Sequence, residues 1–454
     1  MMIRWLRVGS VLLGALSLLM GVLVLAESSK APADGAGVQG AADAPAVQAQ
    51  AGGAPVEGVV GGPAGQGAEA DTTAASIVER GRYLVDAGNC VSCHTRKNGE
   101  PFTGGVAFET PFGTLYSTNI TPDADTGIGR WTREDLRRAM HEGVAPGGTR
   151  LYPAFPYTSY TKVSNEDVDA IFAYLQTLTP VRYTPPSNGI LFSQRWAMRI
   201  WNALFFEPGR FEPDPAQSAE WNRGAYLTEG LGHCSACHTP RNRFMAEIGE
   251  QAHQGGVVSD HAADGKSRVW FAVNLTSAQN GLAAWSEDDL FRYLHTGFSR
   301  RAGSFGPMNE VIVNSLRKMT AEDVRAMAIY LKSLPAGGEY AGAGVPDELV
   351  EAGRPIYEDK CEKCHGDSGR GGIFSGPPLA GSVIVQSENP GSLFNIILHG
   401  PETPDEVSYG QWETMSSYGD VLSDAQIAAV SNYLRGSWGN KARPVTEDEV
   451  AAHR

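Results

Sequence analysis

The stretch GNCVSCHT, residues 88–95, holds two cysteines separated by two residues and a histidine directly after the second. The same pattern returns as CSACH at residues 234–238 and as CEKCH at residues 361–365. The three copies use all six cysteines of the 454-residue chain: Cys90, Cys93, Cys234, Cys237, Cys361 and Cys364. No cysteine is therefore left for a disulfide or a separate reactive site.

The spacing is that of a covalent haem attachment site. Two cysteines on one helical turn can each add to a vinyl group of one porphyrin, and the next histidine then faces the iron. Zinc would need four ligands, but more than a hundred residues separate successive pairs. A thioredoxin-type dithiol would lie near a βαβ pattern, which is missing. The motifs predict three haem c groups with His94, His238 and His365 as proximal iron ligands.

The flanks of the motifs repeat as well. Helical patterns precede each motif at residues 76–90, 218–234 and 348–361. Shorter amphipathic segments follow at residues 132–143, 286–297 and 392–400, and closing helices at 164–178, 320–334 and 423–438. Each closing helix starts with Ser or Thr and has an acidic or amide residue three positions on, which predicts a capping box. The sequence predicts an all-α fold of three tandem domains similar to class I cytochromes c, each a small helical bundle around one covalent haem.

These patterns divide the chain as follows. Repeat 1 covers residues 74–183, repeat 2 covers 217–337 and repeat 3 covers 347–440. The connector 184–216 is rich in aromatic residues, which we expect to pack against the chain's own domains. Residues 441–454 read as a polar tail, and residues 27–73 read as an Ala-, Gly- and Pro-rich flexible tether.

The first 26 residues carry a targeting signal. Val8–Ala26 has no charged residue and follows Arg4 and Arg7. The run is close to the roughly 20 residues that cross a bilayer and longer than the apolar region of a usual signal peptide, about 7–15 residues. A membrane anchor is favoured over a cleaved signal peptide, and both export the rest of the chain. We expect the protein on the periplasmic side of the bacterial inner membrane, held by this segment.

The charge balance excludes one class of partner. The formal net charge is −14 at pH 7. Nucleic-acid binding depends on clustered Lys and Arg that neutralise phosphates. We therefore expect no nucleic-acid partner.

A second axial ligand is expected on the open face of each haem, usually Met or His. Met308 and Met415 stand at matching places in repeats 2 and 3, in Gly- and Ser-rich loops before the closing helix. Both are predicted iron ligands rather than core methionines, unlike Met327 on a closing helix.

Repeat 1 departs from this pattern because Phe155 stands in the methionine slot. Met140 and His141 are the familiar alternatives within the repeat. His141, however, matches His295 and His399, which suggests a role common to all three repeats. Three possibilities stay open: an open iron position, ligation by His141 or Met140, and a ligand from outside the repeat.

Polar segments after the motifs, at residues 110–123, 270–279 and 376–381, have a second predicted role. A backbone carbonyl there can accept a hydrogen bond from the proximal imidazole and orient it.

Beyond the motifs, the chain resembles the triheme cytochrome c subunits of bacterial membrane-bound periplasmic dehydrogenases. The resemblance covers nearly all of residues 75–440 and rests on the stretches at 110–123, 151–162, 222–242 and 306–311. It implies the same haem-binding cysteines and histidines and the ligands Met308 and Met415. The family usually has Met where this chain has Phe155, so that ligand does not carry over.

The resemblance implies an electron relay that is no enzyme on its own. Its partner would be a dehydrogenase catalytic subunit with a pyrroloquinoline quinone, flavin or molybdenum cofactor, acting on an alcohol, aldehyde or sugar acid. The electrons would pass to membrane ubiquinone or a terminal oxidase. Two alternatives are a multihaem enzyme that uses an open first haem, peroxidase-like or gas-binding, and a free-standing carrier.

Overall fold

The computed structural model describes residues 74–454, apart from residues 191–194, 262–266, 339–341, 373–374, 405–406 and 408–411. The apolar run Val8–Ala26 and the tether 27–73, with the predicted anchor, lie outside the described residues. Among the described residues, no helix is long and apolar enough to cross a membrane.

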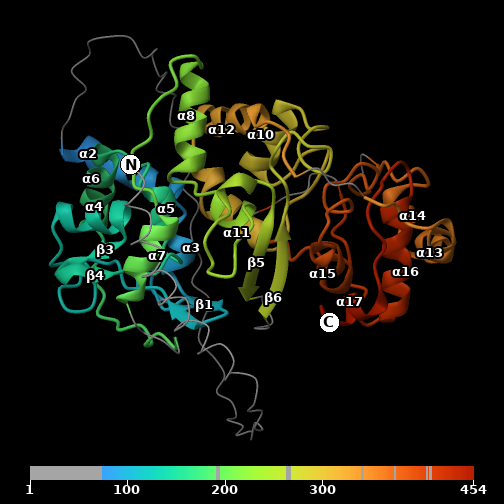
Figure 1. Cartoon of the computed structure of the whole chain (residues 1–454), viewed down its shortest axis with the longest axis horizontal. Helices are drawn as coiled ribbons and strands as arrows, with labels where there is room; N and C mark the ends of the chain where they lie inside the picture. The colour runs from blue at the N-terminus through green and yellow to red at the C-terminus, as the bar shows by residue number, and fades with distance from the viewer. Residues whose placement is uncertain are drawn as a thin grey trace, which may run out of the picture. The chain divides into compact units, whose positions relative to one another are not determined.

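Each repeat is built on its first and last helices, which pack across each other (Figure 1). The pairs are α2 (Ala74–Ala87) with α6 (Asn165–Leu175), α8 (Ala219–Glu229) with α12 (Ala321–Ser333), and α13 (Asp347–Lys360) with α16 (Asp424–Gly436). A third helix packs against each last helix: α4 (Arg133–Glu142), α10 (Glu287–Thr296) and α15 (Gly391–His399). All nine helices lie where the sequence predicts them.

Shorter elements complete the repeats. The cysteine motifs fall on α3 (Cys90–His94), α9 (Ser235–His238) and α14 (Glu362–His365). Two further helices, α5 (Tyr157–Tyr160) and α11 (Pro307–Asn314), carry the segments before the closing helices of repeats 1 and 2. The 3₁₀ turns are η1 (Pro146–Gly148), η2 (Gly249–Gln251) and η3 (Leu316–Lys318).

A glycine lets the paired helices touch backbone to backbone. A Cβ atom added at Gly81 would lie 1.9 Å from the carbonyl oxygen of Ala170. The equivalent distances are 1.9 Å from Gly224 to Ala326 and 2.0 Å from Gly353 to Ala429. The glycine shared by the three first helices is therefore required by close approach.

Only one closing helix has the full capping box that the sequence predicts. In α16 the Ser423 hydroxyl and the Gln426 side chain cap each other's backbone amides. Ser164 caps α6 and Thr320 caps α12 without the reciprocal bond. The carboxylates that would supply it are bound by arginine and tyrosine side chains instead, as described below.

The fold is mostly helical, as predicted, but not all-α. Within the described ranges, three two-stranded antiparallel sheets pair β1 (Ala107–Thr110) with β2 (Gly113–Tyr116), β3 (Val144–Ala145) with β4 (Thr149–Arg150), and β5 (Gly256–His261) with β6 (Ser267–Ala272). In β6, Arg268 and Trp270 are buried whereas Ser267 and Val269 are exposed. Because a charged residue is buried and a valine is exposed, this burial does not follow an apolar–polar alternation in the sequence, and the strand was not predicted.

The predicted polar tail joins the core of repeat 3. It forms α17 (Glu447–Ala451), which packs on α16 and buries Val450 completely. Asn432 of α16 exchanges two hydrogen bonds with the backbone of Val445, 3.0 and 2.8 Å long. One apolar residue per helical turn is enough to dock such a short segment, even though its composition is polar.

The cores of repeats 1 and 2 exchange side chains. Ala87, at the end of α2, is buried in the core of repeat 2. Leu231, at the equivalent place after α8, is buried in the core of repeat 1 and is 1% exposed. Burial of a leucine side chain stabilises by about 2 kcal/mol, so the exchange holds the two repeats together.

Candidate haem-attachment sites

The three predicted proximal histidines share one geometry. In each, Nδ1 lies at hydrogen-bonding distance from a backbone carbonyl oxygen: His94 at 2.7 Å from Thr118, His238 at 2.7 Å from Val273 and His365 at 2.9 Å from Pro377. A carbonyl oxygen only accepts, so Nδ1 carries the proton and Nε2 keeps the lone pair that an iron ligand needs. All three carbonyls lie in the segments that the sequence predicts for this role.

The cysteines have the properties of attachment sites rather than of thiolates. All six are half-buried and free of disulfides. Burial raises the pKa of Cys90 and of Cys234 to about 12 and that of Cys361 to about 11. A redox dithiol needs a depressed thiol pKa. Within the described part of the chain, no three His, Cys, Asp or Glu side chains group as a metal ion would require. The residues therefore fit covalent haem.

The residues in the methionine slot lie against the same cores as the motifs. Met308 on α11 and Cys234 both pack against the core of repeat 2. Met415 and Cys361 both pack against the core of repeat 3. Phe155 and Cys90 both pack against the core of repeat 1. Iron ligation by the two methionines remains a prediction.

Comparison with known proteins gives the family. The chain matches the cytochrome c family over residues 78–179 and 350–438. It is 39% identical over 404 residues to the gluconate 2-dehydrogenase cytochrome c subunit of Pantoea cypripedii, covering 85% of this chain and 91% of that protein. The chain belongs to the family of cytochrome c subunits of membrane-bound dehydrogenases.

Two further relatives agree. The chain is 37% identical over 397 residues to the cytochrome c subunit of alcohol dehydrogenase (quinone) from Gluconacetobacter polyoxogenes, covering 83% of each. It is 43% identical over 371 residues to one of the nicotinate dehydrogenase subunits of Pseudomonas putida, covering 80% of this chain but only 30% of that protein. Membership of this family confirms two predictions for the chain, that it binds haem c and that it transfers electrons.

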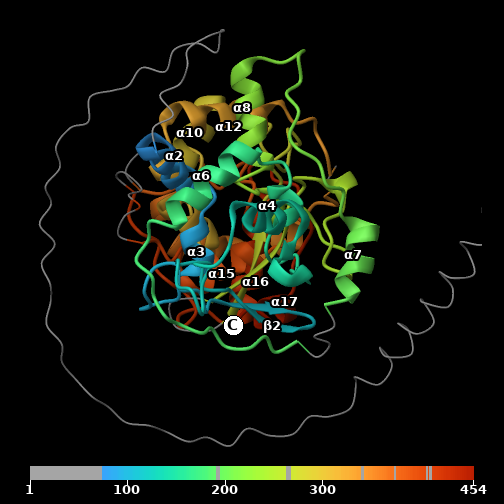
Figure 2. The same ribbon diagram turned by 90° about the vertical axis from the view of Figure 1, so that its left-hand side faces the viewer.

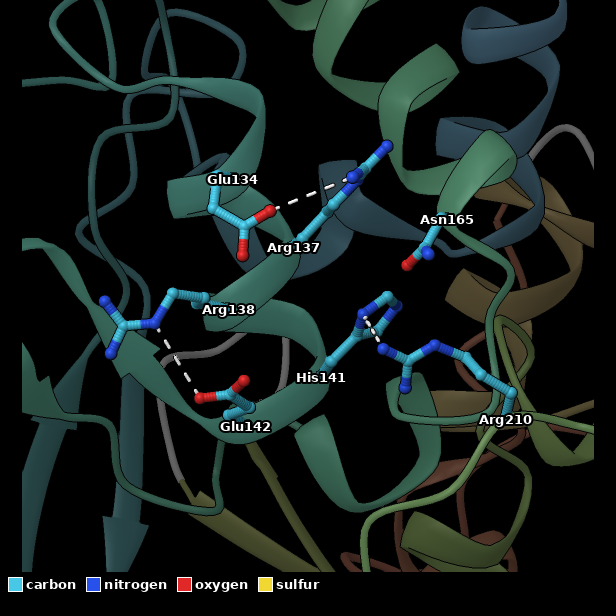
Figure 3. A pocket seen from close by; sticks show the side chains of 7 residues that line it. All are labelled: Glu134, Arg137, Arg138, His141, Glu142, Asn165 and Arg210. Atoms are coloured by element: carbon cyan, nitrogen blue, oxygen red, sulfur yellow. Dashed lines mark hydrogen bonds and ion pairs between the residues drawn. The ribbon is translucent and has the colours of Figure 1, made fainter.

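The structure places His141 among charged side chains. Its ring lies in a cavity of about 200 Å³ (Figure 3), lined by Glu134, Arg137, Arg138, His141, Glu142, Asn165 and Arg210. Its Nδ1 contacts the guanidinium of Arg210, which comes from the connector. Burial and the Arg210 charge lower the pKa of His141 to about 4, so its ring is neutral at pH 7.

The two matching histidines of this cytochrome c subunit bond to backbone carbonyls instead. Nδ1 of His295 lies 3.3 Å from the Leu316 oxygen, and Nε2 of His399 lies 3.3 Å from the His453 oxygen. All three therefore hold polar partners at the end of the third helix. The contacts differ, because the His141 ring faces a guanidinium and the other two rings face carbonyl oxygens, so a role common to the three histidines remains a prediction.

The first two motifs lie close together. The repulsion between the Cys93 and Cys237 thiols adds to burial in raising the pKa of Cys93 to about 12. Asn314 at the end of α11 donates a 2.8 Å hydrogen bond to Ser92, in the middle of the first motif. In the reverse direction, Ser159 of α5 lies 3.4 Å from Ser235 in the second motif. The attachment sites of repeats 1 and 2 thus face each other across their interface.

Helix α11 also reaches repeat 3. Asn309, next to Met308, donates hydrogen bonds to the carbonyl oxygens of Pro401 and Glu402, 3.4 and 3.1 Å away. Arg268 of β6 forms an ion pair with Glu402. The helix that carries the predicted haem 2 ligand therefore contacts both neighbouring repeats.

A buried charge cluster beside the second motif was not predicted. Glu229 accepts hydrogen bonds from Lys162 of repeat 1 at 2.9 Å and from Tyr330 of α12 at 2.8 Å. Its third contact is His253, whose Nε2 lies 2.6 Å from Glu229. Burial is the largest cause of the raised pKa of Cys234, and the negative charge of Glu229 is the second largest. The Glu229 carboxylate therefore lies near the second attachment motif. Nothing in the local sequence links these four residues, because they come from separate segments.

Proposed function

We propose that this chain is a triheme electron relay. Its six cysteines would attach three haems, and His94, His238 and His365 would bind the irons through Nε2. Bound haem supplies a one-electron Fe(III)/Fe(II) couple. The observation that carries the proposal is the matched orientation of the three imidazoles by backbone carbonyls. That orientation fixes the ring and increases the donor strength of Nε2.

The protein would tune the three couples differently. Met308 and Met415 are the proposed sixth ligands of haems 2 and 3, and a methionine ligand raises the reduction potential. Haem 1 would lack an iron–methionine bond. Phe155 fills the slot with its ring edge-on to Tyr160, 5.3 Å between centroids, and Met140 is buried in the core. Because His141 contacts Arg210, we favour an open sixth position over His141 ligation.

The contacts favour an order of transfer in which repeat 2 is central. Helix α11 bonds to Ser92 of the first motif at one end and to Glu402 of repeat 3 at the other. Electrons would then pass between haems 1 and 3 by way of haem 2.

The partner proposed is a dehydrogenase catalytic subunit, in keeping with the names of the relatives. Its cofactor would be pyrroloquinoline quinone, a flavin or a molybdenum centre, and its substrate an alcohol, aldehyde or sugar acid. Electrons would leave to ubiquinone or a terminal oxidase. The chain would lie on the periplasmic side of the inner membrane, anchored by residues 8–26.

Haem counting tests the central proposal. The full chain, purified after expression with a haem-ligation system, should have a mass increased by three haems. The double variant Cys361→Ser, Cys364→Ser should lose one haem and keep two. If the mass of the wild-type protein showed only two haems, one of the three repeats would not bind haem and the triheme proposal would be wrong.

Methionine variants test the ligands. Met308→Leu and Met415→Leu should each lower one reduction potential and make one further haem, in addition to haem 1, able to bind carbon monoxide. Met327→Leu is the control, because Met327 is a buried core residue on α12 that is only 2% exposed. Its spectrum should not change, since a Leu-for-Met exchange in a core costs less than about 1.5 kcal/mol. An unchanged potential in Met308→Leu would exclude that residue as a ligand.

A further inference from the structure

Helix α7 (Ala197–Phe205) of the connector is apolar on its outer side as well as its inner side. Trp201 is buried and donates a 2.9 Å hydrogen bond to the Phe244 carbonyl oxygen. On the solvent side of the helix, Trp196 is 59% exposed, Ile200 is 48% exposed and Leu204 is 60% exposed. These three are spaced four residues apart, so they form one stripe. Figure 2 shows α7 at the outer edge of the described ribbon.

The inner side fixes the helix to repeat 1 and the start of repeat 2. Trp201 packs edge-on against Tyr157, 6.4 Å between ring centroids, and Phe205 stacks on Phe244 at 5.8 Å. The outer stripe is therefore held in place by a packed core and is not a frayed turn. An exposed apolar stripe that is held in place can enter an apolar environment such as the boundary region of a bilayer.

Arginines occur on α7 and next to it although the chain is strongly acidic overall. Arg199 lies on the exposed side of α7, and Arg195 precedes the helix. Arg195 donates a hydrogen bond to the Arg150 carbonyl oxygen, and exposed Arg243 lies over the Phe244 ring at 5.2 Å. Glu207, just past the helix, is the nearest acidic residue along the chain.

We propose that α7 lies on the surface of a bilayer that contains anionic phospholipids. The stripe would enter the boundary between head groups and acyl chains, and the arginines would contact lipid phosphates. Tryptophan, large aliphatic side chains and flanking arginines are the composition of helices that lie in this interface. An anionic membrane attracts the arginines and repels the acidic remainder of the protein, so the face that carries α7 would turn toward the membrane.

A lipid surface suits the stripe better than a protein partner. Three partly exposed side chains present far less area than the roughly 800 Å² per partner of a stable protein interface. Ile200 and Leu204 carry no hydrogen-bonding side-chain group, and the indole N–H of Trp196 suits the head-group region of a bilayer. The inference rests on the proposed membrane location, where the apolar run at residues 8–26 would hold the folded part near lipid.

A spin label on the stripe tests the proposal. Ala203 is exposed on α7, and Ala352 is an exposed alanine on α13 in repeat 3. In the haem-loaded full chain, a cysteine added at either place would be the reactive thiol. Ala203→Cys and Ala352→Cys variants would carry a nitroxide and be mixed with vesicles of phosphatidylethanolamine and phosphatidylglycerol, or of phosphatidylcholine alone.

The expected result is specific to one position and one lipid. With anionic vesicles, the label at 203 should become accessible to oxygen and shielded from a water-soluble nickel complex, while the label at 352 stays in water. If the protein sediments with vesicles but the label at 203 stays in water, α7 does not bind lipid and the membrane location stands. If the protein does not sediment, both ideas fail.

Other outcomes also overturn the proposal. Shielding at 203 without vesicles would mean that the chain's own N-terminal part covers α7. Shielding from both relaxants only after adding the dehydrogenase partner would mean that a protein binds there. The variant Ile200→Ser, Leu204→Ser should abolish lipid exposure of the label at 203. The control Val257→Ser, Val269→Ser alters two exposed valines of the β5–β6 sheet and should leave it unchanged.

Discussion

The Tyr226 hydroxyl of α8 donates a 2.6 Å hydrogen bond to the carboxylate of Asp167 on α6. The equivalent bond in the other direction joins the Tyr83 hydroxyl of α2 to Asp323 on α12, at 2.5 Å. Each tyrosine thus leaves its own repeat and binds the first turn of the other repeat's closing helix. Repeats 1 and 2 are therefore related as two halves of a pseudo-symmetric pair.

The same carboxylates hold an arginine from their partner helix. Arg80 donates to Asp167 at 2.7 Å, and Arg223 donates to Asp323 at 2.8 Å. This engagement explains why α6 and α12 lack the reciprocal capping bond that α16 has.

Loss of one tyrosine hydroxyl should weaken the pair. Tyr226→Phe leaves buried Asp167 with one hydrogen bond fewer, which should lower the free energy of unfolding by about 1–2 kcal/mol. Denaturant unfolding followed by the haem absorbance of repeats 1 and 2 measures it. The control is Tyr357→Phe, whose hydroxyl bonds to Gly366 inside repeat 3. Tyr357→Phe should leave the contact between repeats 1 and 2 intact. If Tyr226→Phe and Tyr357→Phe weakened that contact equally, the Tyr226 hydroxyl would not be what holds the two repeats together.

Glu229 should make stability depend on pH. Burial opposes its ionisation, but the hydrogen bond and charge of His253 and the charge of Lys162 outweigh burial and hold its pKa well below the usual range. The folded pKa is depressed, so the stabilisation is complete above about pH 5 and is lost as pH falls below the unfolded value of about 4.3. Chemical unfolding across this range should show that slope.

Glu229→Gln tests the same cluster. Removing one partner of a buried ion pair costs about 3 kcal/mol at pH 7, and the variant should show a flatter acid slope. Glu79→Gln is the matched control. Glu79 pairs with Arg82 at the surface, so its loss should change stability little. An acid slope unchanged in Glu229→Gln would exclude Glu229 as its source.

The shared glycine should tolerate no side chain. Gly224→Ala would put a methyl group 1.9 Å from the Ala326 oxygen, so α8 and α12 must separate. We expect a loss of about 3 kcal/mol or more, seen as a lower melting temperature and less haem in repeat 2. Gly249→Ala is the control, because an added Cβ there meets no atom within 4 Å. A melting temperature equal in both variants would refute the close-approach argument.

Restoring methionine at the slot tests the assignment of haem 1. Phe155→Met should create an iron–sulfur bond, raise the lowest reduction potential and abolish carbon monoxide binding. The control Phe172→Met changes a half-buried phenylalanine of α6 against the same core. It should leave both properties unchanged. If the wild-type protein binds no carbon monoxide, the proposal of an open site at haem 1 fails.

The sequence by itself determined the local features of this protein. Cys–X–X–Cys–His needs only one helical turn to place three groups around one porphyrin, so Cys90, Cys93 and His94 predict haem c without any knowledge of the fold. Helix ends were predictable for the same reason, since Ser423 and Gln426 cap their own helix. The carbonyl acceptors could be assigned to short segments but not to residues such as Thr118.

Only the tertiary structure decided which repeats touch and how. Tyr83, Tyr226 and Tyr357 look alike in the sequence, yet two bond to another repeat and one stays within its own. The cluster around Glu229 gathers residues from four separate segments, and the burial of Trp201 is what distinguishes the inner face of α7 from its outer face. Contacts between distant segments depend on how packed surfaces match, and no local pattern encodes that match.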